Sequence, residues 1–302
     1  MQLPRRVFIR EVGPRDGLQP EQRFLETEKK IELVNRLLDC GIRMVEATSF
    51  VSPRAIPQLR DAEAVIGGVG RPPGAVISAL VGNARGVERA RQAGVDEVQV
   101  VISASESHNR RNVNMSIEQS LGQLDATIQA AAGTRLRVRA AVAVAFGCPF
   151  EGEIGEARIK EMIKEYHQRG IRQVTLADTA GMGNPRQVFK LVRLLREAFP
   201  DLELGLHFHD TRGLGLANAL AGMQAGVEIL ESSIGGLGGC PFIPRATGNI
   251  ATEDLVNMCE LMGVNTGVDL ARLLLLARWL QGEMGRQLPG RLLKLGDEVF
   301  CR

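Results

Sequence analysis

The sequence predicts an α/β fold of the (β/α)8 TIM-barrel class with additional C-terminal helices. Short runs rich in β-branched residues alternate with longer stretches of helical periodicity, and about eight such alternations fit into 302 residues. Several predicted helices end on glycine immediately before the next predicted strand, as a turn from helix to strand requires. The alternative fold is an open doubly wound sheet, but no GxGxxG motif follows the first predicted strand.

The strand-like runs are Val7–Val12, Arg43–Ala47, Ala75–Val81, Glu97–Ser103, Leu136–Ala145, Gln173–Ala177, Leu204–Phe208 and Val227–Ser232. Thr27 is the predicted cap of the first helix, TEKKIELVNRLLDCG, and Asn184 caps a later helix that has Pro185 at its first position. The other helical stretches are ARGVERARQAG, IEQSLGQLDATIQAAAG, GEARIKEMIKEYHQRG and LANALAGMQAG, followed in the tail by TEDLVNMCELMG and DLARLLLLARWLQGEMG. We therefore predict one catalytic domain over residues 1–302, with the barrel at about 5–250 and the C-terminal helices at about 251–285.

The composition bounds the class of protein. Hydrophobic residues make up 44% of the chain, and the net charge of +2 gives no support for binding to nucleic acid or to a membrane. The start, MQLPRRVFIREVG, has two arginines but no apolar run behind them, so we expect no signal peptide. Five scattered cysteines argue against a disulfide framework and favour a reducing, cytoplasmic location.

Polar residues collect at the carboxyl ends of the predicted strands, where TIM-barrel enzymes place their chemistry. Arg15, Asp16 and Gln19 follow the first strand, and Glu46 and Ser49 follow the second. The sixth strand runs into Asp178 and Thr179, and the seventh into the tetrapeptide HFHD. The opposite ends of the strands are preceded mainly by glycine, so the asymmetry predicts an active site at one rim.

The tetrapeptide HFHD at 207–210 suggests a metal site. His207 and His209 are two residues apart on a strand end, so both side chains point to the same side. Asp16 supplies a carboxylate oxygen across the barrel mouth, and Asn249 supplies an amide oxygen. Oxygen and nitrogen ligands without cysteine favour Mg²⁺ or Mn²⁺ over structural zinc, while catalytic zinc or cobalt stays open. Asp210 either accepts a hydrogen bond from a metal-binding histidine, on the side away from the metal, or is an acid at the start of a helix.

Taken together, the motifs resemble those of hydroxymethylglutaryl-CoA lyase, in a superfamily of metal-dependent lyases and synthases built on TIM barrels. They are EVGPRDGLQ, TSFVSP, GCPFEG, ADTAGMG, HFHDTRGLGLAN and GGLGGCPF with ATGNIATEDLV, in one order from about Val7 to Gly267. The resemblance implies a metal held by Asp16, His207, His209 and Asn249. It also implies a catalytic arginine at Arg15, a catalytic cysteine at Cys240, and supporting acids at Glu46 and Asp178.

The implied reaction is the retro-Claisen cleavage of 3-hydroxy-3-methylglutaryl-CoA to acetyl-CoA and acetoacetate. A divalent cation would lower the pKa of the substrate alcohol, and either His207 or Asp16 would take its proton. Arg15 would face the enolate, with Glu46 and Asp178 orienting it; ordinary ion pairing at strand ends is the alternative for these acids. Cys240, in a glycine-rich loop that can close over substrate, would return a proton to the acetyl-CoA carbanion.

Other polar residues carry weaker expectations. Gln19, Ser49 and Thr179 face the predicted mouth and either bind substrate or cap turns. His108, Arg110 and Arg111, in the stretch SESHNRRN, either contact the phosphates of CoA or form a solvated charged loop. We expect Cys148, Cys40 and Cys259 to be packed in the interior and Cys301 to be a free thiol near the terminus.

The chain departs from the lyase pattern at three points, because Arg212 replaces a tyrosine, VRAAV lacks an aromatic residue, and His108 replaces another aromatic. The reaction class is unaffected, but a bulkier 3-hydroxyacyl-CoA, such as a longer 3-hydroxyglutaryl-CoA homologue, or citramalyl-CoA becomes an alternative substrate. Claisen-condensing synthases of the isopropylmalate type are a second alternative, although those usually carry an extra regulatory domain, which we do not expect in this protein. A non-catalytic binding barrel is a third.

We expect an acyl-CoA partner, a homodimer or higher homo-oligomer through the tail helices, and a place in leucine degradation and ketone body metabolism.

Overall fold

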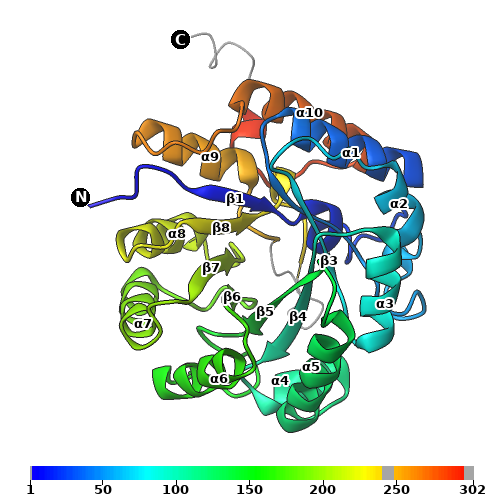
Figure 1. Cartoon of the computed structure of the whole chain (residues 1–302). Helices are drawn as coiled ribbons and strands as arrows, with labels where there is room; N and C mark the ends of the chain where they lie inside the picture. Colours follow the sequence, from blue (N-terminus) through cyan, green and yellow to red (C-terminus); the bar gives the residue numbers. More distant parts are fainter. Residues whose placement is uncertain (1, 240–247, 296–302) are drawn as a thin grey trace.

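The computed structural model describes residues 2–239 and 248–295, and its eight strands close into a parallel barrel in sequence order (Figure 1). The strands are β1 (Phe8–Glu11), β2 (Met44–Ser49), β3 (Val76–Leu80), β4 (Glu97–Ser103), β5 (Arg137–Ala143), β6 (Gln173–Asp178), β7 (Glu203–Phe208) and β8 (Ile229–Ser232). β1 pairs in parallel with both β2 and β8, which closes the barrel. The predicted TIM-barrel fold is therefore confirmed.

Helices surround the barrel as a ring. They are α1 (Thr27–Asp39), α2 (Ala62–Gly68), α3 (Ala84–Ala93), α4 (Glu106–Val113), α5 (Ile117–Ala131), α6 (Glu156–Gln168), α7 (Pro185–Ala198), α8 (Gly215–Gln224), α9 (Thr252–Leu261) and α10 (Leu270–Met284). Short helical turns are η1 (Gly13–Gly17), η2 (Pro57–Leu59), η3 (Ile234–Gly236) and η4 (Leu292–Lys294). Neither α2 nor α4 is predicted from the sequence, because both are short and α4 is largely polar. α4 forms because the side chain of Ser105 accepts a hydrogen bond from the backbone of His108 and caps its start.

Two local predictions need correction and one is confirmed. The side chain of Asn184 caps α7, with Pro185 at the first helical position, as predicted. Thr27 is not a cap, because α1 begins with it; its hydroxyl instead donates to Asp61 over 2.8 Å. β5 ends at Ala143 rather than two residues later, since Val144 adopts a left-handed backbone with φ of 52°, which a strand cannot continue through.

A layer of buried charges crosses the barrel interior below its carboxyl-end rim. Arg139 on β5 forms ion pairs with Glu97 on β4 at 3.0 Å and with Glu231 on β8 at 2.9 Å. Arg10 on β1 also pairs with Glu97. All four side chains are almost inaccessible to solvent. Bulky aliphatic residues usually fill this part of a TIM barrel. Here the two arginines and two glutamates neutralise one another, and Glu231 also lines the pocket described below.

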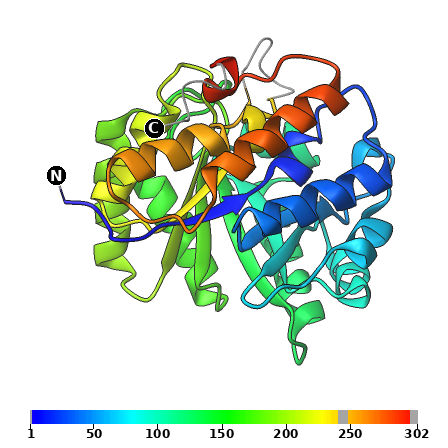
Figure 2. The same ribbon diagram turned by 90° about the horizontal axis from the view of Figure 1, so that it is seen from above.

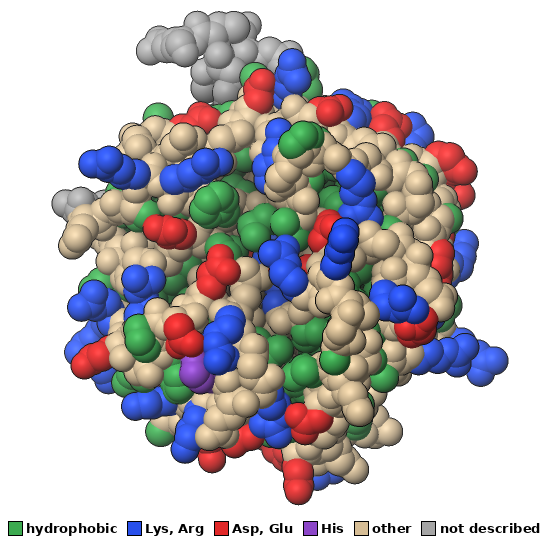
Figure 3. All heavy atoms as spheres, viewed as in Figure 1, with side chains coloured by type: hydrophobic (Ala, Val, Ile, Leu, Met, Phe, Trp, Pro, Cys, Tyr) green, Lys and Arg blue, Asp and Glu red, His purple; other side chains and the backbone are tan. Residues whose placement is uncertain are grey.

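Of the two C-terminal helices on the outside of the barrel, α10 packs beside α1 and α9 packs against α10. Figure 2 shows α10 running along α1, and the two helices are in contact. Acidic and basic side chains are interspersed over the face shown in Figure 3, which agrees with the near-neutral net charge. Over residues 2–239 and 248–295, no helix combines the length and apolar character needed to cross a bilayer.

Candidate active site

The turn after β1 brings Arg15 and Asp16 to the rim of the barrel. Both residues lie in η1, whose first residues include Pro14, which suits the start of a helical turn. Arg15 donates to one oxygen of Glu46 from Nε at 3.0 Å and from Nη2 at 2.7 Å, and to Asp16 from Nη1 at 2.6 Å. Glu46 is completely buried on β2. Paired carboxylates therefore fix the guanidinium plane while one edge stays on the pocket wall.

Asp16 meets the two histidines of β7 in the same region. One ligand atom from each of Asp16, His207 and His209 lies within 4.8 Å of the others, and the Nε2 atom of His209 is 3.9 Å from Oδ2 of Asp16. Burial alone would raise the pKa of Asp16, but the charges of Arg15, His207 and His209 outweigh it and hold that pKa at about 2. Asp16 is therefore an ionised carboxylate under all ordinary conditions, as a cation ligand must be.

Asn249 completes this set from the far end of the sequence. It forms an isolated antiparallel bridge with His209, and its Nδ2 atom donates to Asp16 at 2.8 Å and to the carbonyl of Leu237 at 3.1 Å. Its Oδ1 atom is buried and has no hydrogen-bond partner in the described part of the chain. A buried carbonyl oxygen without a partner is unfavourable unless a cation or a donor fills the space. The four predicted residues thus fit a divalent cation with oxygen and nitrogen ligands.

Glu231 on β8 is a site residue that the sequence analysis does not identify. Its Oε2 atom lies 3.2 Å from Nδ1 of His207, and its Oε1 atom accepts hydrogen bonds from Thr175 and Arg139, both at 2.9 Å. Burial would raise the pKa of Glu231, but Arg139 and His207 outweigh it and hold that pKa far below its usual range. Because the Nδ1 atom of His207 faces Glu231, only its Nε2 atom can point toward a bound cation. The only sign of this role in the sequence is that a glutamate interrupts the apolar start of the strand segment ILES.

Two further buried acids hold the loops that surround the site. One oxygen of Glu11 accepts the N–H groups of Gly13 at 2.7 Å and Ile234 at 2.9 Å, and the other accepts the hydroxyl of Thr252 at 2.6 Å. Glu253 accepts the N–H of Gly235 at 3.0 Å. Burial raises the pKa of Glu11 to about 7 and that of Glu253 to about 8. The starts of η1, η3 and α9 are thereby tied together, although the sequence analysis predicts a role for neither acid.

The remaining predicted rim residues divide into those that line the pocket and those that do not. Gln19 and Thr179 line it, and Oε1 of Gln19 is buried without a hydrogen-bond partner among the described residues. Thr179 also accepts the N–H of Val144 at 3.1 Å. Ser49 is not among the residues that line the pocket; its hydroxyl accepts the N–H of Val51, which fits the second expectation for this residue, that it caps a turn.

The predicted orientation of Arg15 by two acids is only half correct. Glu46 contacts Arg15 as described above, but no ion pair or hydrogen bond joins Asp178 to Arg15, both of which are described residues. The two oxygens of Asp178 instead accept the N–H groups of Met182 and Gly183 at 2.8 and 2.9 Å. Asp178 therefore shapes the loop after β6. Asp210 likewise accepts the N–H of Gly215 at the start of α8, which settles its role as a helix-start acid.

His108 is not in a solvated loop and does not suit phosphate binding. It lies in α4, is 2% exposed, and its Nδ1 atom is 2.6 Å from the hydroxyl of Ser103. Burial lowers its pKa, which keeps the ring neutral. Arg110 is paired with Glu106 at 2.9 Å, and Arg111 stacks over the ring of Phe150. These two arginines are therefore ordinary surface cations with protein partners.

The described cysteines are interior residues, as predicted. Cys40, Cys148 and Cys259 are buried free thiols, and the Sγ atom of Cys148 contacts the hydroxyl of Ser105. Cys240 and Cys301 lie outside the described residues. Gly239, the residue before Cys240, lines the pocket.

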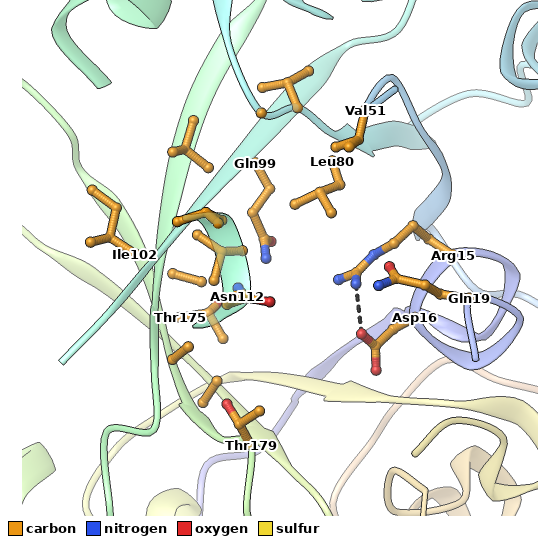
Figure 4. A pocket seen from close by; sticks show the side chains of 18 of the residues that line it. Arg15, Asp16, Gln19, Val51, Leu80, Gln99, Ile102, Asn112, Thr175 and Thr179 are labelled. Carbon is orange, nitrogen blue, oxygen red and sulfur yellow. Dashed lines mark hydrogen bonds and ion pairs between the residues drawn. The ribbon is translucent and has the colours of Figure 1, made fainter. Parts of the chain in front are cut away.

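These residues surround one cavity of about 330 Å³ at the rim of the barrel. Figure 4 shows Arg15, Asp16 and Gln19 gathered at one side of it, with Gln99, Leu80 and Asn112 across the space. Arg15 supplies a fixed positive charge, and the Asp–His–His–Asn set supplies cation ligands. The fold and the site together define a TIM-barrel enzyme with a candidate divalent-metal centre.

Comparisons with known proteins identify the family. The sequence profile of the HMGL-like family matches residues 6–280. The chain is 43% identical over 295 residues to hydroxymethylglutaryl-CoA lyase of Bacillus subtilis (strain 168), covering 98% of this chain and 99% of that protein. It is also 43% identical over 272 residues to the mitochondrial hydroxymethylglutaryl-CoA lyase of Homo sapiens, covering 90% of this chain and 84% of the human protein.

Solved structures give the same result. The crystal structure of the B. subtilis HMG-CoA lyase matches with a TM-score of 0.94 at 44% identity, covering 97% of this chain and 99% of that one. A structure of an HMG-CoA lyase from Acinetobacter baumannii in complex with coenzyme A and 3-methylmalate matches with a TM-score of 0.93 at 43% identity, covering 98% and 97%. The chain therefore belongs to the HMGL-like family, and it is a lyase.

Proposed function

We propose that this enzyme cleaves 3-hydroxy-3-methylglutaryl-CoA to acetyl-CoA and acetoacetate by retro-Claisen chemistry. The observation that carries the proposal is the ion pair of the Arg15 guanidinium with the Asp16 carboxylate, placed beside His207 and His209 at one rim of the barrel. The full-length similarity to hydroxymethylglutaryl-CoA lyases supports the substrate, and the A. baumannii relative with bound coenzyme A supports a CoA thioester. A Claisen-condensing synthase is less well supported, since the relatives over nearly the full length are lyases.

In this proposal Asp16, His207, His209 and Asn249 hold Mg²⁺ or Mn²⁺. Such a cation would lower the pKa of the substrate's tertiary alcohol and fix its orientation. His207 acts as a ligand and not as the base. Its Nδ1 atom is hydrogen-bonded to Glu231, and its Nε2 atom cannot both bind a cation and accept a proton. Asp16 is ionised and has two carboxylate oxygens, so we assign to it the acceptance of the alcohol proton as well as a contact with the cation.

The cleavage leaves negative charge on the thioester oxygen of the departing acetyl-CoA unit. We assign the stabilisation of that charge to Arg15, whose guanidinium is held by Glu46 and Asp16 and does not reorganise as the charge develops. Gln19 is assigned to substrate binding because it lines the pocket and its buried Oε1 atom has no hydrogen-bond partner within residues 2–239 and 248–295. Cys240 is assigned the return of a proton to the acetyl-CoA carbanion, which converts it to the methyl group of the product.

The test is an assay of acetyl-CoA release from 3-hydroxy-3-methylglutaryl-CoA, with and without Mg²⁺ or Mn²⁺. We expect metal-dependent cleavage that is lost in Cys240→Ala and retained in the control Cys40→Ala, since Cys40 lies at the end of α1 away from the pocket. No cleavage by the metal-loaded protein would contradict the proposed function.

We also propose a cytoplasmic enzyme of leucine degradation and ketone body metabolism that forms a homodimer or higher homo-oligomer. The three described free thiols fit a reducing compartment. Exposed Leu261 on α9 and Leu275 on α10 favour a contact through the tail helices. Light scattering of the purified protein tests the oligomer, and a mass of 32.8 kDa would contradict it.

A further inference from the structure

The wall of the cavity formed by β4 carries a glutamine with an unpaired amide. Gln99 is the third residue of β4 and lies on the same face of the strand as Glu97, which pairs with Arg139 inside the barrel. The side chain of Gln99 therefore points inward as well, and it lines the cavity. Figure 4 shows its amide reaching into this space, across from Arg15.

This amide is buried without a hydrogen bond. Gln99 is 3% exposed, and its Oε1 atom has no hydrogen-bond partner within residues 2–239 and 248–295. Its Nε2 atom donates to none of those residues either. Burying an amide without partners is unfavourable, and bulky aliphatic residues usually fill the interior of a TIM barrel. We therefore expect the amide to meet a polar group that binds in the cavity.

The orientation of the amide follows from its neighbour on β5. Gln99 and Arg139 are register partners, so both side chains point to the same side of the sheet. The Nη2 atom of Arg139 also lacks a hydrogen bond in the described part of the chain. Its positive charge favours the orientation in which the amide oxygen lies nearer to the guanidinium. The N–H groups of Nε2 then face the cavity and require an acceptor.

The chemistry of the proposed substrate leaves one acceptor for these N–H groups. In the proposed cleavage, the alcohol oxygen faces the cation ligands and the thioester oxygen faces Arg15. The coenzyme A portion is too large for a cavity of about 330 Å³ and must extend out of its mouth, whereas Gln99 lies within the barrel. The free carboxylate is the remaining polar group of the acyl portion. An alkyl group in the same place would leave the amide unpaired, so Gln99 selects the carboxylate over the methyl group.

We propose that Gln99 determines specificity by donating a hydrogen bond from Nε2 to the free carboxylate of the substrate. The inference rests on the proposed function, because it assigns a further residue to the same substrate. Gln99 takes part in no bond making or breaking, and its role is to distinguish an acidic acyl thioester from a neutral one of the same shape.

The experiment replaces Gln99 by methionine, which has a similar length and no amide. With 3-hydroxy-3-methylglutaryl-CoA and Mn²⁺, Gln99→Met should lower kcat/KM by roughly 10- to 100-fold, as expected when a hydrogen bond to a charged group is lost. Gln129→Met is the matched control, because Gln129 is exposed on α5, and it should keep the parent kcat/KM.

Binding of uncleavable analogues separates recognition of the carboxylate from a general effect on the pocket. 3-Methylglutaryl-CoA and 3,5-dimethylhexanoyl-CoA both lack the alcohol, and the second carries an isobutyl group in place of the carboxymethyl group. In metal-free protein, Gln99→Met should raise the Kd of the first by about tenfold or more and leave the Kd of the second within about threefold of the parent value. Because the amide has no partner in the protein, the Tm of Gln99→Met should equal or exceed that of the parent.

Equal changes in Kd for the two analogues would overturn the inference, and so would an unchanged kcat/KM in Gln99→Met. A Tm well below that of the parent would overturn it as well, since the amide would then support the fold. A parent protein that shows the expected difference between the analogues but does not cleave 3-hydroxy-3-methylglutaryl-CoA with Mn²⁺ would refute the proposed function and leave the carboxylate contact standing.

Discussion

Glu231→Gln is the substitution that most directly tests how this barrel holds its candidate metal ligands. The change keeps the size of the side chain but removes the negative charge that lies 3.2 Å from Nδ1 of His207. Loss of such an outer partner typically weakens metal binding by roughly 10- to 100-fold. Because the amide oxygen can still accept a hydrogen bond from His207, we expect a loss of about tenfold, or about 1.4 kcal/mol.

The same substitution should also destabilise the fold. Arg139 loses the charge of a partner at 2.9 Å but keeps Glu97 at 3.0 Å and Glu46 at 3.8 Å. Breaking a buried ion pair usually costs about 3–5 kcal/mol. Since a second close carboxylate remains for Arg139, we expect the lower end of that range, about 3 kcal/mol.

Isothermal titration with Mn²⁺ measures the first effect, and urea denaturation without metal measures the second. Glu228→Gln is the matched control, because Glu228 lies three residues earlier and is exposed. An affinity for Mn²⁺ that is equal in the Glu231→Gln and Glu228→Gln variants would refute the assignment of Glu231 as the residue that orients His207.

Three other predictions follow from the same structure. Arg15→Lys removes the two-nitrogen contact with Glu46 and should lower kcat for acetyl-CoA release by roughly 10²- to 10³-fold; a kcat within tenfold of the parent would contradict its role. Burial raises the pKa of Glu253 from 4.5 to about 8, so its folded form retains a proton that the unfolded chain releases. The stability that this proton provides is fully present below about pH 4.5 and falls as the pH rises to 8, by up to about 5 kcal/mol. In Glu253→Gln, the free energy of unfolding from urea denaturation should depend less steeply on pH. An equally steep dependence in this variant would contradict the prediction. Glu11→Gln places an amide N–H₂ group against the groups of Gly13, Ile234 or Thr252 that donate to Glu11. The lost hydrogen bond should reduce the free energy of unfolding by about 1–3 kcal/mol. An unchanged urea denaturation curve would contradict this prediction.

Some expectations about the site differ from the structure because they concern contacts that form only when the chain folds. SESHNRRN resembles a polar loop, yet α4 buries His108 against Ser103. Ser49 and Asp178 sit at strand ends, as expected, and their oxygens accept nearby backbone N–H groups. A strand-end position predicts that a side chain is near the rim; it does not predict which of the local donors the side chain will contact.

The barrel can be predicted from the sequence alone, because alternating strand and helix periodicities with glycine at the turns are local properties of the chain. The meeting of Asp16, His207 and His209 can be predicted in the same way, since carboxyl ends of parallel strands converge on one rim. The contact of Glu231 with His207 and the links that Glu11 and Glu253 make between the loops are visible only in the folded structure. The reason is that each of these depends on which residues of different strands share one level of the barrel, and that level is set by the register of strands far apart in sequence.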